Sequence, residues 1–588
     1  MLMCANVQHS FILSHYSKVD SKINKVIKEV FVFSISVIAS LLFSSSLNAQ
    51  GSNWYHGAVT AETPFNIGTD DLYSKVIKDK KGSSVVVAVI DSGVDIEHVD
   101  LVNKIWINTD EIPGNGIDDD RNGYIDDING WNFIGGKDGG QVGPDTYEMT
   151  RAYAKLQQKY GDRDPQGLTG KDLEEYNQYN EWGRKIESEI STGKSRYDEY
   201  NGAITFYKDI LGYLNDFTGD GDLTPALIDS LRNGTSREAQ VSTNVIQAVE
   251  ADLGRTPTLE EVEGLLLPPD IYGALDFFGN KFKYNYNVDF DPRNIVGDDY
   301  YDFDNRSYGN NLVEGPDATH GTHVSGIIAA ERNNGLGIDG VSADARIMVI
   351  RAVPDGDERD KDVANAIRYA VDNGAQIINM SFGKGLSPEK SYVDDAVRYA
   401  EKKDVLLVHA AGNSSENIDV ADNYPNDTYE KAKGFLFWKK KKPKAWISVG
   451  AVNNSNDENI VAAFSNYGDS DVDLFAPGQN IRSTTPDDTY QIQQGTSMAA
   501  PVVAGVAALL RSYFPKLTAV QVKDILLSTS TPVNEMVRQP GSENLVPFSE
   551  LSVSDGIVNA KAAFIKASQT KGKKKINCLL YTSPSPRD

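Results

Sequence analysis

The sequence contains almost no cysteine. Of its 588 residues only Cys4 and Cys578 carry a thiol, and both lie near the chain ends. A disulfide framework is therefore excluded for the central part of the chain. Basic residues are also few: 58 Lys and Arg stand against 83 Asp and Glu, a formal net charge of −25. Because phosphate binding needs a basic surface, this balance argues against a nucleic-acid binder and favours metal cations as partners.

Both ends of the chain are set apart from the rest. Several lysines, the apolar run Val30–Phe43 and Leu47-Asn48-Ala49 follow one another in the order of a secretory signal, so we predict a signal peptide over residues 1–49. The run is shorter than the roughly 20 residues of a membrane helix, which makes an uncleaved anchor the weaker alternative. An exported protein is expected, in the periplasm, at the cell surface or outside the cell, with no stable membrane span once matured. After a basic tail at 569–577, residues 578–588 resemble a translated sequencing adapter, a scar that we exclude.

Short apolar runs alternate with helical patterns over most of the chain. Runs of this kind suit strands buried on both faces, and the alternation predicts an α/β fold with a doubly wound, mostly parallel sheet flanked by helices. The predicted strands are 85–90, 346–350, 376–380, 405–411 and 446–452, and the predicted helices are 363–373, 392–402, 498–513 and 518–528.

Residues 145–285 depart from this pattern. They are polar, with predicted helices at Leu173–Ile190 and Ser195–Leu214 and a capping box from Thr258 to Glu261. We therefore predict an inserted helical subdomain that divides the main domain into residues 50–144 and 286–568. Its residue types do not indicate a function.

Three polar motifs carry candidate chemistry. Asp91 follows the strand 85–90 directly, at the strand end where open α/β sheets build their sites, although a lone Asp there also suits a turn or helix cap. His320-Gly-Thr-His323 opens an apolar helix, and its small neighbours leave His320 accessible as a base, whereas His323 suits the core. A zinc site is the alternative, but the Glu partner is missing. Ser497, in Gly495-Thr-Ser497, begins another apolar helix and alone would be an ordinary N-cap.

Together these motifs resemble the subtilases, the subtilisin-like serine proteases, whose Asp, His and Ser arrive in the same order. The resemblance spans roughly residues 53–567, interrupted by the insert. Matching segments are Val-Ile-Asp91-Ser-Gly, His320-Gly-Thr-His-Val-Ser-Gly, Gly-Thr-Ser497-Met-Ala-Ala-Pro, Asn379-Met-Ser381-Phe-Gly383 and Ala410-Ala-Gly-Asn413.

The resemblance implies a serine endopeptidase that cleaves proteins or peptides and uses no organic cofactor. Ser497 would attack the scissile carbonyl, His320 would take its proton, and Asp91 would orient the imidazole. The amide of Asn413 would stabilise the oxyanion together with the Ser497 N–H. The segment Ser381, Phe382 and Gly383 would pair with an extended substrate by strand addition.

The chain also departs from the family pattern. Many secreted subtilases carry an inhibitory propeptide of tens of residues, but only about 40 residues separate Ala49 from Asp91. Folding would then need other help, and the helical insert is a hypothetical source of it. The insert and its acidic flanks also explain the long separation of Asp91 from His320.

These flanks predict structural calcium. One loop follows the first half of the EF-hand pattern but has Asn129 in place of the final Glu, and an Asx-rich turn is the alternative. A second acidic cluster precedes His320, where a solvated acidic loop is the alternative, and a third, weaker cluster lies in the insert. The first set is Asp118, Asp120, Asn122, Tyr124, Asp126 and Asp127; the second is Asp298, Asp299, Asp302 and Asp304, with Asp289 and Asp291; the third is Asp216, Asp220 and Asp222.

Two other functional classes remain alternatives. A catalytically inactive subtilase-like surface protein would bind peptides or calcium, but it has no need of Asp91, His320, Ser497 and Asn413 together. A carboxylate-pair glycosidase would use the acidic clusters and leave the Ser and His motifs unexplained. The Lys-rich run 438–444 would contact an anionic surface or, more simply, form a solvated loop.

Overall fold

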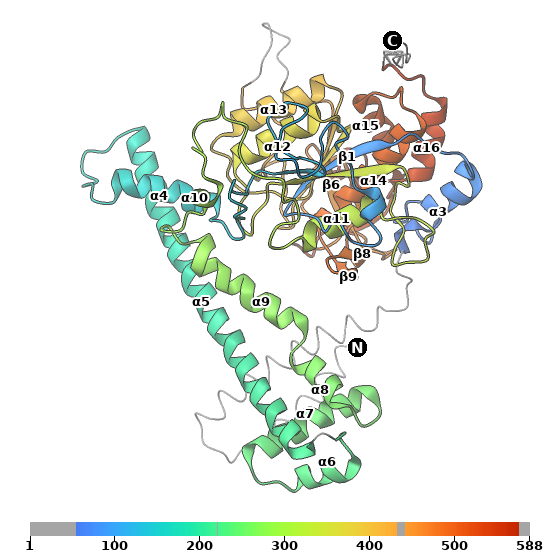
Figure 1. Ribbon diagram of the computed structural model, residues 1–588. Helices are drawn as coiled ribbons and strands as arrows, with labels where there is room; N and C mark the ends of the chain where they lie inside the picture. Colours follow the sequence, from blue (N-terminus) through green and yellow to red (C-terminus); the bar gives the residue numbers. More distant parts are fainter. Residues whose placement is uncertain (1–53, 220, 432–440, 575–588) are drawn as a thin grey trace. The chain divides into compact units, whose positions relative to one another are not determined.

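The computed structural model describes residues 54–219, 221–431 and 441–574 (Figure 1). The predicted signal peptide, the adapter scar and the first part of the Lys-rich run lie outside these residues. Within them, no helix combines the length and apolar character needed to cross a membrane. The chain divides into a larger unit, residues 52–189 and from 281 onward, and a smaller unit, residues 190–280.

A nine-stranded sheet forms the centre of the larger unit. Its strand order is β10-β13-β7-β6-β5-β4-β1-β3-β2, and all neighbours pair in parallel except β10 with β13. Two hairpins, β8–β9 and β11–β12, stand apart from it. The bounds are β1 Val85–Asp91, β2 Gly130–Asn132, β3 Ala345–Arg351, β4 Ile377–Met380, β5 Leu406–Ala410, β6 Trp446–Val452, β7 Leu474–Pro477, β8 Ile481–Thr485, β9 Thr489–Gln493, β10 Thr531–Pro532, β11 Met536–Arg538, β12 Leu545–Pro547 and β13 Gly556–Ile557.

Helices cover both faces of the sheet. Val87 and Val89 of β1 share one apolar cluster with α11 and α14, whereas Ala88 and Ile90 share another with α12 and α13. Alternate residues of a strand point to opposite faces, so one apolar run serves both layers. The predicted doubly wound α/β fold is thus confirmed. The bounds are α3 Thr69–Asp71, α4 Glu148–Tyr160, α10 Arg293–Val296, α11 Thr319–Ala329, α12 Asp360–Asp372, α13 Lys390–Lys402, α14 Thr496–Tyr513, α15 Ala519–Ser528 and α16 Ala560–Gln569.

The long helix α5 joins the two helical stretches predicted at Leu173–Ile190 and Ser195–Leu214, and it runs without a break from Lys171 to Thr218. It contains four glycines: Gly183, Gly193, Gly202 and Gly212. Each costs only about 1 kcal/mol relative to alanine, which the good helix formers between them offset.

The smaller unit has an apolar core of its own. Leu214, Ile228, Ile246 and Val262 are among its buried residues. The predicted capping box at Thr258 is present, with hydrogen bonds of 3.1 and 2.8 Å between Thr258 and Glu261 in both directions. The remaining helices are α6 Pro225–Arg232, α7 Arg237–Leu253, α8 Leu259–Leu266 and α9 Pro269–Asn280.

Because each unit has its own core, we expect the larger unit to fold after residues 190–280 are deleted. Glu189 and Lys281 form a 3.0 Å ion pair, so a short Gly-Ser linker can join the cut ends. The melting temperature of the larger unit, measured by calorimetry, should stay close to its value in the full chain. Failure of the shortened chain to fold would instead support the folding role expected of the insert.

Candidate active site

The carboxylate at the end of β1 lies against the imidazole at the start of α11. Asp91 Oδ1 is 2.7 Å from His320 Nδ1 and also accepts a 2.8 Å hydrogen bond from the backbone of Ser92. The close approach of α11 to β1 depends on Gly321, because a Cβ there would clash with the carbonyl of Gly93. The pair is therefore built into the packing of the helix on the strand.

This pair fixes which nitrogen of His320 carries the proton. A carboxylate only accepts hydrogen bonds, so Nδ1 carries the proton and Nε2 keeps its lone pair. Burial disfavours the imidazolium, but the charge of Asp91 and its hydrogen bond outweigh burial and raise the pKa of His320. The side chain of His320 is 38% exposed against 3% for Asp91, so substrate can reach the ring while the carboxylate stays shielded.

His323, one turn further along α11, belongs to the core as expected. It is fully buried, and its Nε2 lies 3.0 and 3.1 Å from the carbonyls of Ile481 and Gln491 in the β8–β9 hairpin. Burial lowers its pKa to about 3, so the ring stays neutral. Its polar contacts are structural.

Ser497 is the second residue of α14, which begins at Thr496 directly after Gly495. Gly495 has a φ of 151°, in the region that favours glycine. Its hydroxyl donates to the carbonyl of Ser381 at 3.0 Å, and the Ser381 hydroxyl donates back to the Ser497 carbonyl at 2.9 Å. The two segments are thus tied together. For the Ser497 hydroxyl to donate to any other acceptor, it would have to rotate away from this carbonyl.

The amide of Asn413 is oriented by its neighbour on α14. Its Oδ1 accepts hydrogen bonds from the backbone N–H and the hydroxyl of Thr496, at 2.8 and 2.9 Å. These two hydrogen bonds engage only the amide oxygen, so the NH₂ group can donate to another acceptor. A Cβ on Gly495 would lie 3.3 Å from Asn413 Nδ2 and 3.6 Å from the backbone nitrogen of Ser497, so both donors border the same position. Two such donors can stabilise a developing oxyanion.

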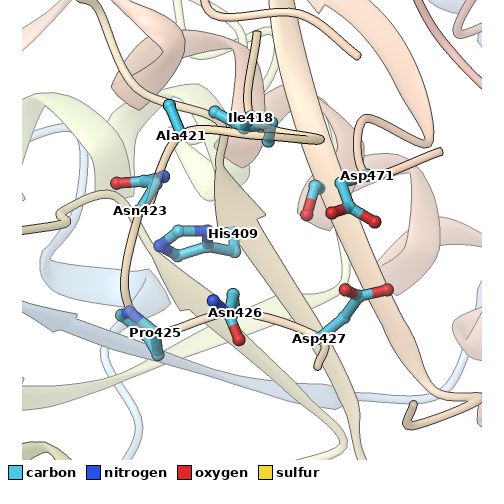
Figure 2. A pocket seen from close by; sticks show the side chains of 9 residues that line it. His409, Ile418, Ala421, Asn423, Pro425, Asn426, Asp427 and Asp471 are labelled. Carbon is cyan, nitrogen blue, oxygen red and sulfur yellow. The ribbon is translucent and has the colours of Figure 1, made fainter. Parts of the chain in front are cut away.

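The segment Ser381–Gly383 continues from β4 beside a polar pocket. The carbonyl of Phe382 accepts a 2.8 Å hydrogen bond from Nε2 of His409, a buried residue whose pKa burial lowers to about 4. Figure 2 shows His409 among the residues that line the pocket, with the loop that carries Asn423 and Asn426 on one side and Asp471 on the other. One wall of the pocket is therefore attached to the predicted substrate segment.

In the first predicted calcium loop, the carboxylates that come together are not the set that the motif predicted. Asp118 and Asp126 use their carboxylates to accept backbone N–H groups, at 2.9 to 3.2 Å. The oxygens that gather within 4.8 Å of one another belong to Glu111, Asp120 and Asp127, where Glu111 is 5% and Asp127 0% exposed. Burial raises the pKa of Asp127 to about 6. Glu111 precedes the EF-hand-like pattern, which is why the motif did not indicate it.

That loop contains the other predicted ligands as hydrogen-bonding residues. Asn122 donates from its side chain to Asp120 and Asp127, and its Oδ1 accepts the backbone N–H of Tyr124 at 2.8 Å. The loop is therefore held together by its own polar groups, with the three gathered carboxylates at its centre.

The second acidic cluster needs a correction at Asp298. Its carboxylate is 2% exposed and pairs with Arg293 and Lys361, both at 2.6 Å, so protein cations already neutralise the charge that suggested calcium. Asp291 likewise pairs with Arg359 at 2.7 Å. Exposed carboxylates remain at four positions: Asp289, Asp299, Asp302 and Asp304. In the insert, Asp220 lies outside the described residues.

Comparison with known proteins gives the following matches. A model of the subtilase family matches residues 82–547. The thermophilic serine proteinase of Bacillus sp. (strain AK1) is 41% identical over 194 residues, 33% of this chain and 42% of that protein. Subtilisin amylosacchariticus of Bacillus subtilis subsp. amylosacchariticus is 38% identical over 222 residues, 36% and 51% of the two chains. This chain thus spans about half, or less, of the length of these two relatives.

Subtilisin BL of Lederbergia lenta is covered more fully. It is 35% identical over 247 residues, which are 42% of this chain and 77% of that protein. Among solved structures, a protease from Pseudoalteromonas arctica is 30% identical, with 44% of this chain and 74% of that chain covered and a TM-score of 0.34.

The Asp91–His320 pair predicts the pH dependence of activity. Since Asp91 raises the pKa of His320, the acid limb of kcat/KM should have its midpoint above 6.5, because the base must be neutral. Asp91→Asn removes the attraction, so the midpoint should move to lower pH while the plateau falls by about 10⁴-fold. A peptide substrate assayed from about pH 5 to 9 tests this. A midpoint unchanged in the variant would contradict it.

Proposed function

Since the chain belongs to the subtilase family, we propose that it is an exported serine endopeptidase that hydrolyses peptide bonds in proteins through an acyl-enzyme. Export rests on the predicted signal peptide over residues 1–49. The single observation that supports the activity best is the 2.7 Å contact between Asp91 and His320, which lie far apart in the chain.

The proposed reaction begins when His320 Nε2 removes the proton of the Ser497 hydroxyl. Ser497 Oγ attacks the scissile carbonyl, and the charge that develops on its oxygen is stabilised by the Asn413 amide and the Ser497 N–H. Asp91 stabilises the imidazolium, which then protonates the leaving amine. Water, activated by the same histidine, releases the acyl group from Ser497 and restores the hydroxyl.

The alternative is an inactive subtilase-like binding protein. A surface that only binds peptides has no use for the Asp91–His320 contact or for the Thr496 contacts that orient Asn413. These contacts favour catalysis because they prepare a base and an oxyanion donor before any substrate is present.

Substitution of the nucleophile tests the proposal. Ser497→Ala should abolish fluorophosphonate labelling and lower casein cleavage by about 10⁶-fold, the loss known for a subtilisin without its serine. Asn413→Ala is the matched control: it should still label, while kcat falls by about 10²–10³-fold. A folded wild-type chain that neither labels nor cleaves would favour the binding protein.

We also propose that the loop around Asp120 binds structural calcium. Carboxylate oxygens are the ligands that calcium prefers, and Glu111, Asp120 and Asp127 bring three of them together, with Glu111 and Asp127 buried. A bound cation would relieve the repulsion among these carboxylates. The proposed ligand set differs from the EF-hand-like set by including Glu111, whose oxygens also accept backbone N–H groups of Asp119, Asp120 and Asp126.

Calcium should raise the melting temperature through this loop. Binding at a hundred times the dissociation constant stabilises the folded state by about 2.7 kcal/mol. In the double variant Glu111→Gln/Asp127→Asn, calcium should no longer raise the melting temperature. In Asp118→Asn, calcium should raise it as much as in the wild type, although the melting temperature without calcium should be lower. Thermal melts in calcium and in chelator measure the increments. Equal increments in all three proteins would show that calcium does not bind here.

A further inference from the structure

Lys384 follows the predicted substrate segment directly and is almost wholly buried. Its side chain is 2% exposed, and its ammonium has three N–H groups. The ammonium donates hydrogen bonds to Glu148 at 2.8 Å and to the carbonyl of Glu358 at 2.7 Å, and it forms an ion pair with Asp360 at 2.9 Å. A buried ammonium with these three partners holds the backbone that carries it in one place.

That backbone also holds the opposite wall of the pocket. Lys384 and Tyr424 exchange two backbone hydrogen bonds of 2.9 and 2.8 Å. Tyr424 stands between Asn423 and Pro425, which line the pocket in Figure 2. A Cβ on Gly383 would lie 2.7 Å from Asn423 Oδ1, so the two walls are in close contact. Lys384 therefore joins the substrate segment to the pocket loop.

The partner of Lys384 comes from the segment between the Asp and His motifs. Glu148 is the first residue of α4, at the beginning of the predicted insert, and Arg151 one turn later donates to the same carboxylate at 2.6 Å. Burial opposes ionisation of Glu148, but Arg151 and Lys384 outweigh it and lower its pKa to about 2. Arg151 and Lys384 thus hold Glu148 in its anionic form.

We infer that Glu148 is a positioning residue for the substrate site: acting through Lys384, it holds the segment Ser381–Gly383 and the Asn423–Pro425 loop at the spacing that an extended peptide needs. This rests on the proposed endopeptidase function. Strand addition demands a segment of defined position, because each backbone hydrogen bond tolerates only small displacements. Glu148 and Lys384 form no ion pair or hydrogen bond with Asp91, His320 or Ser497, so we expect the main effect on KM and only a small effect on kcat, passed on through the hydrogen bonds between Ser381 and Ser497.

The test uses the full chain with Glu148→Gln, which keeps the shape of the side chain and removes its charge. KM for an acetylated hexapeptide anilide should rise by about tenfold, a difference of 1.4 kcal/mol in binding. The kcat value, and the rate of fluorophosphonate labelling, should stay within about twofold of the wild type. KM for an acetyl-alanine ester, which has no upstream residues, should change little.

Asp145→Asn is the matched control. Asp145 lies three residues before Glu148, is 4% exposed and pairs with Arg359 at 2.8 Å and, at the longer distance of 3.6 Å, with Arg151, but it forms no ion pair with Lys384. The Asp145→Asn variant should have a lower melting temperature than the wild type, as Glu148→Gln should, but its KM for the hexapeptide should be unchanged.

Several outcomes would overturn the inference. One is an unchanged hexapeptide KM in folded Glu148→Gln, and another is an equal rise in Asp145→Asn, which would mark a general loss of stability. If Glu148→Gln does not fold, Glu148→Asp replaces it, since it keeps the charge but withdraws it from Lys384 by one methylene. A wild-type chain that neither labels nor cleaves would remove the proposed function instead, so the two failures are distinguishable.

Discussion

The parallel register of β1, β4 and β5 is the constraint on which the candidate site depends. Ile90 pairs with Met380, and Met380 with His409, so the three strands reach the same edge of the sheet at the same level. Asp91, the last residue of β1, lies at this edge and still pairs with Arg351 of β3. Parallel strands all present their carboxyl ends to one edge, and the helices α11 and α14 then begin there with His320 and Ser497.

Charge pairing organises the part of the larger unit that lies between the Asp and His motifs. Arg293, Lys361 and Lys384 are buried, and each has carboxylate partners within 3 Å. Removing one member of such a pair leaves an uncompensated buried charge, which costs about 3–5 kcal/mol. The acidic flanks thus serve in part as partners for buried cations, and they attach α4 and α10 to the sheet domain by specific contacts.

Much of the fold and of the candidate site was predictable because its signals are local. Apolar runs of five to seven residues marked the main strands, and the motifs around Asp91, His320 and Ser497 lie within a few residues of each functional group. The sequence pattern divided α5 into two predicted helices, whereas the structure has one, since helix propensity is only a weak preference. Asp298 was assigned to calcium because the sequence does not show which cations fold back onto an acidic run.

By itself, the sequence determined the α/β class, the family and the identity of the candidate catalytic residues, since residue type and neighbouring residues carry that information. Only the tertiary structure decided the long-range pairs. Glu111 meets Asp127 and Glu148 meets Lys384 because folding closes loops that no short pattern spans. Electrostatic and hydrogen-bond energies depend on distances of a few ångströms, and those distances exist only once the chain has folded.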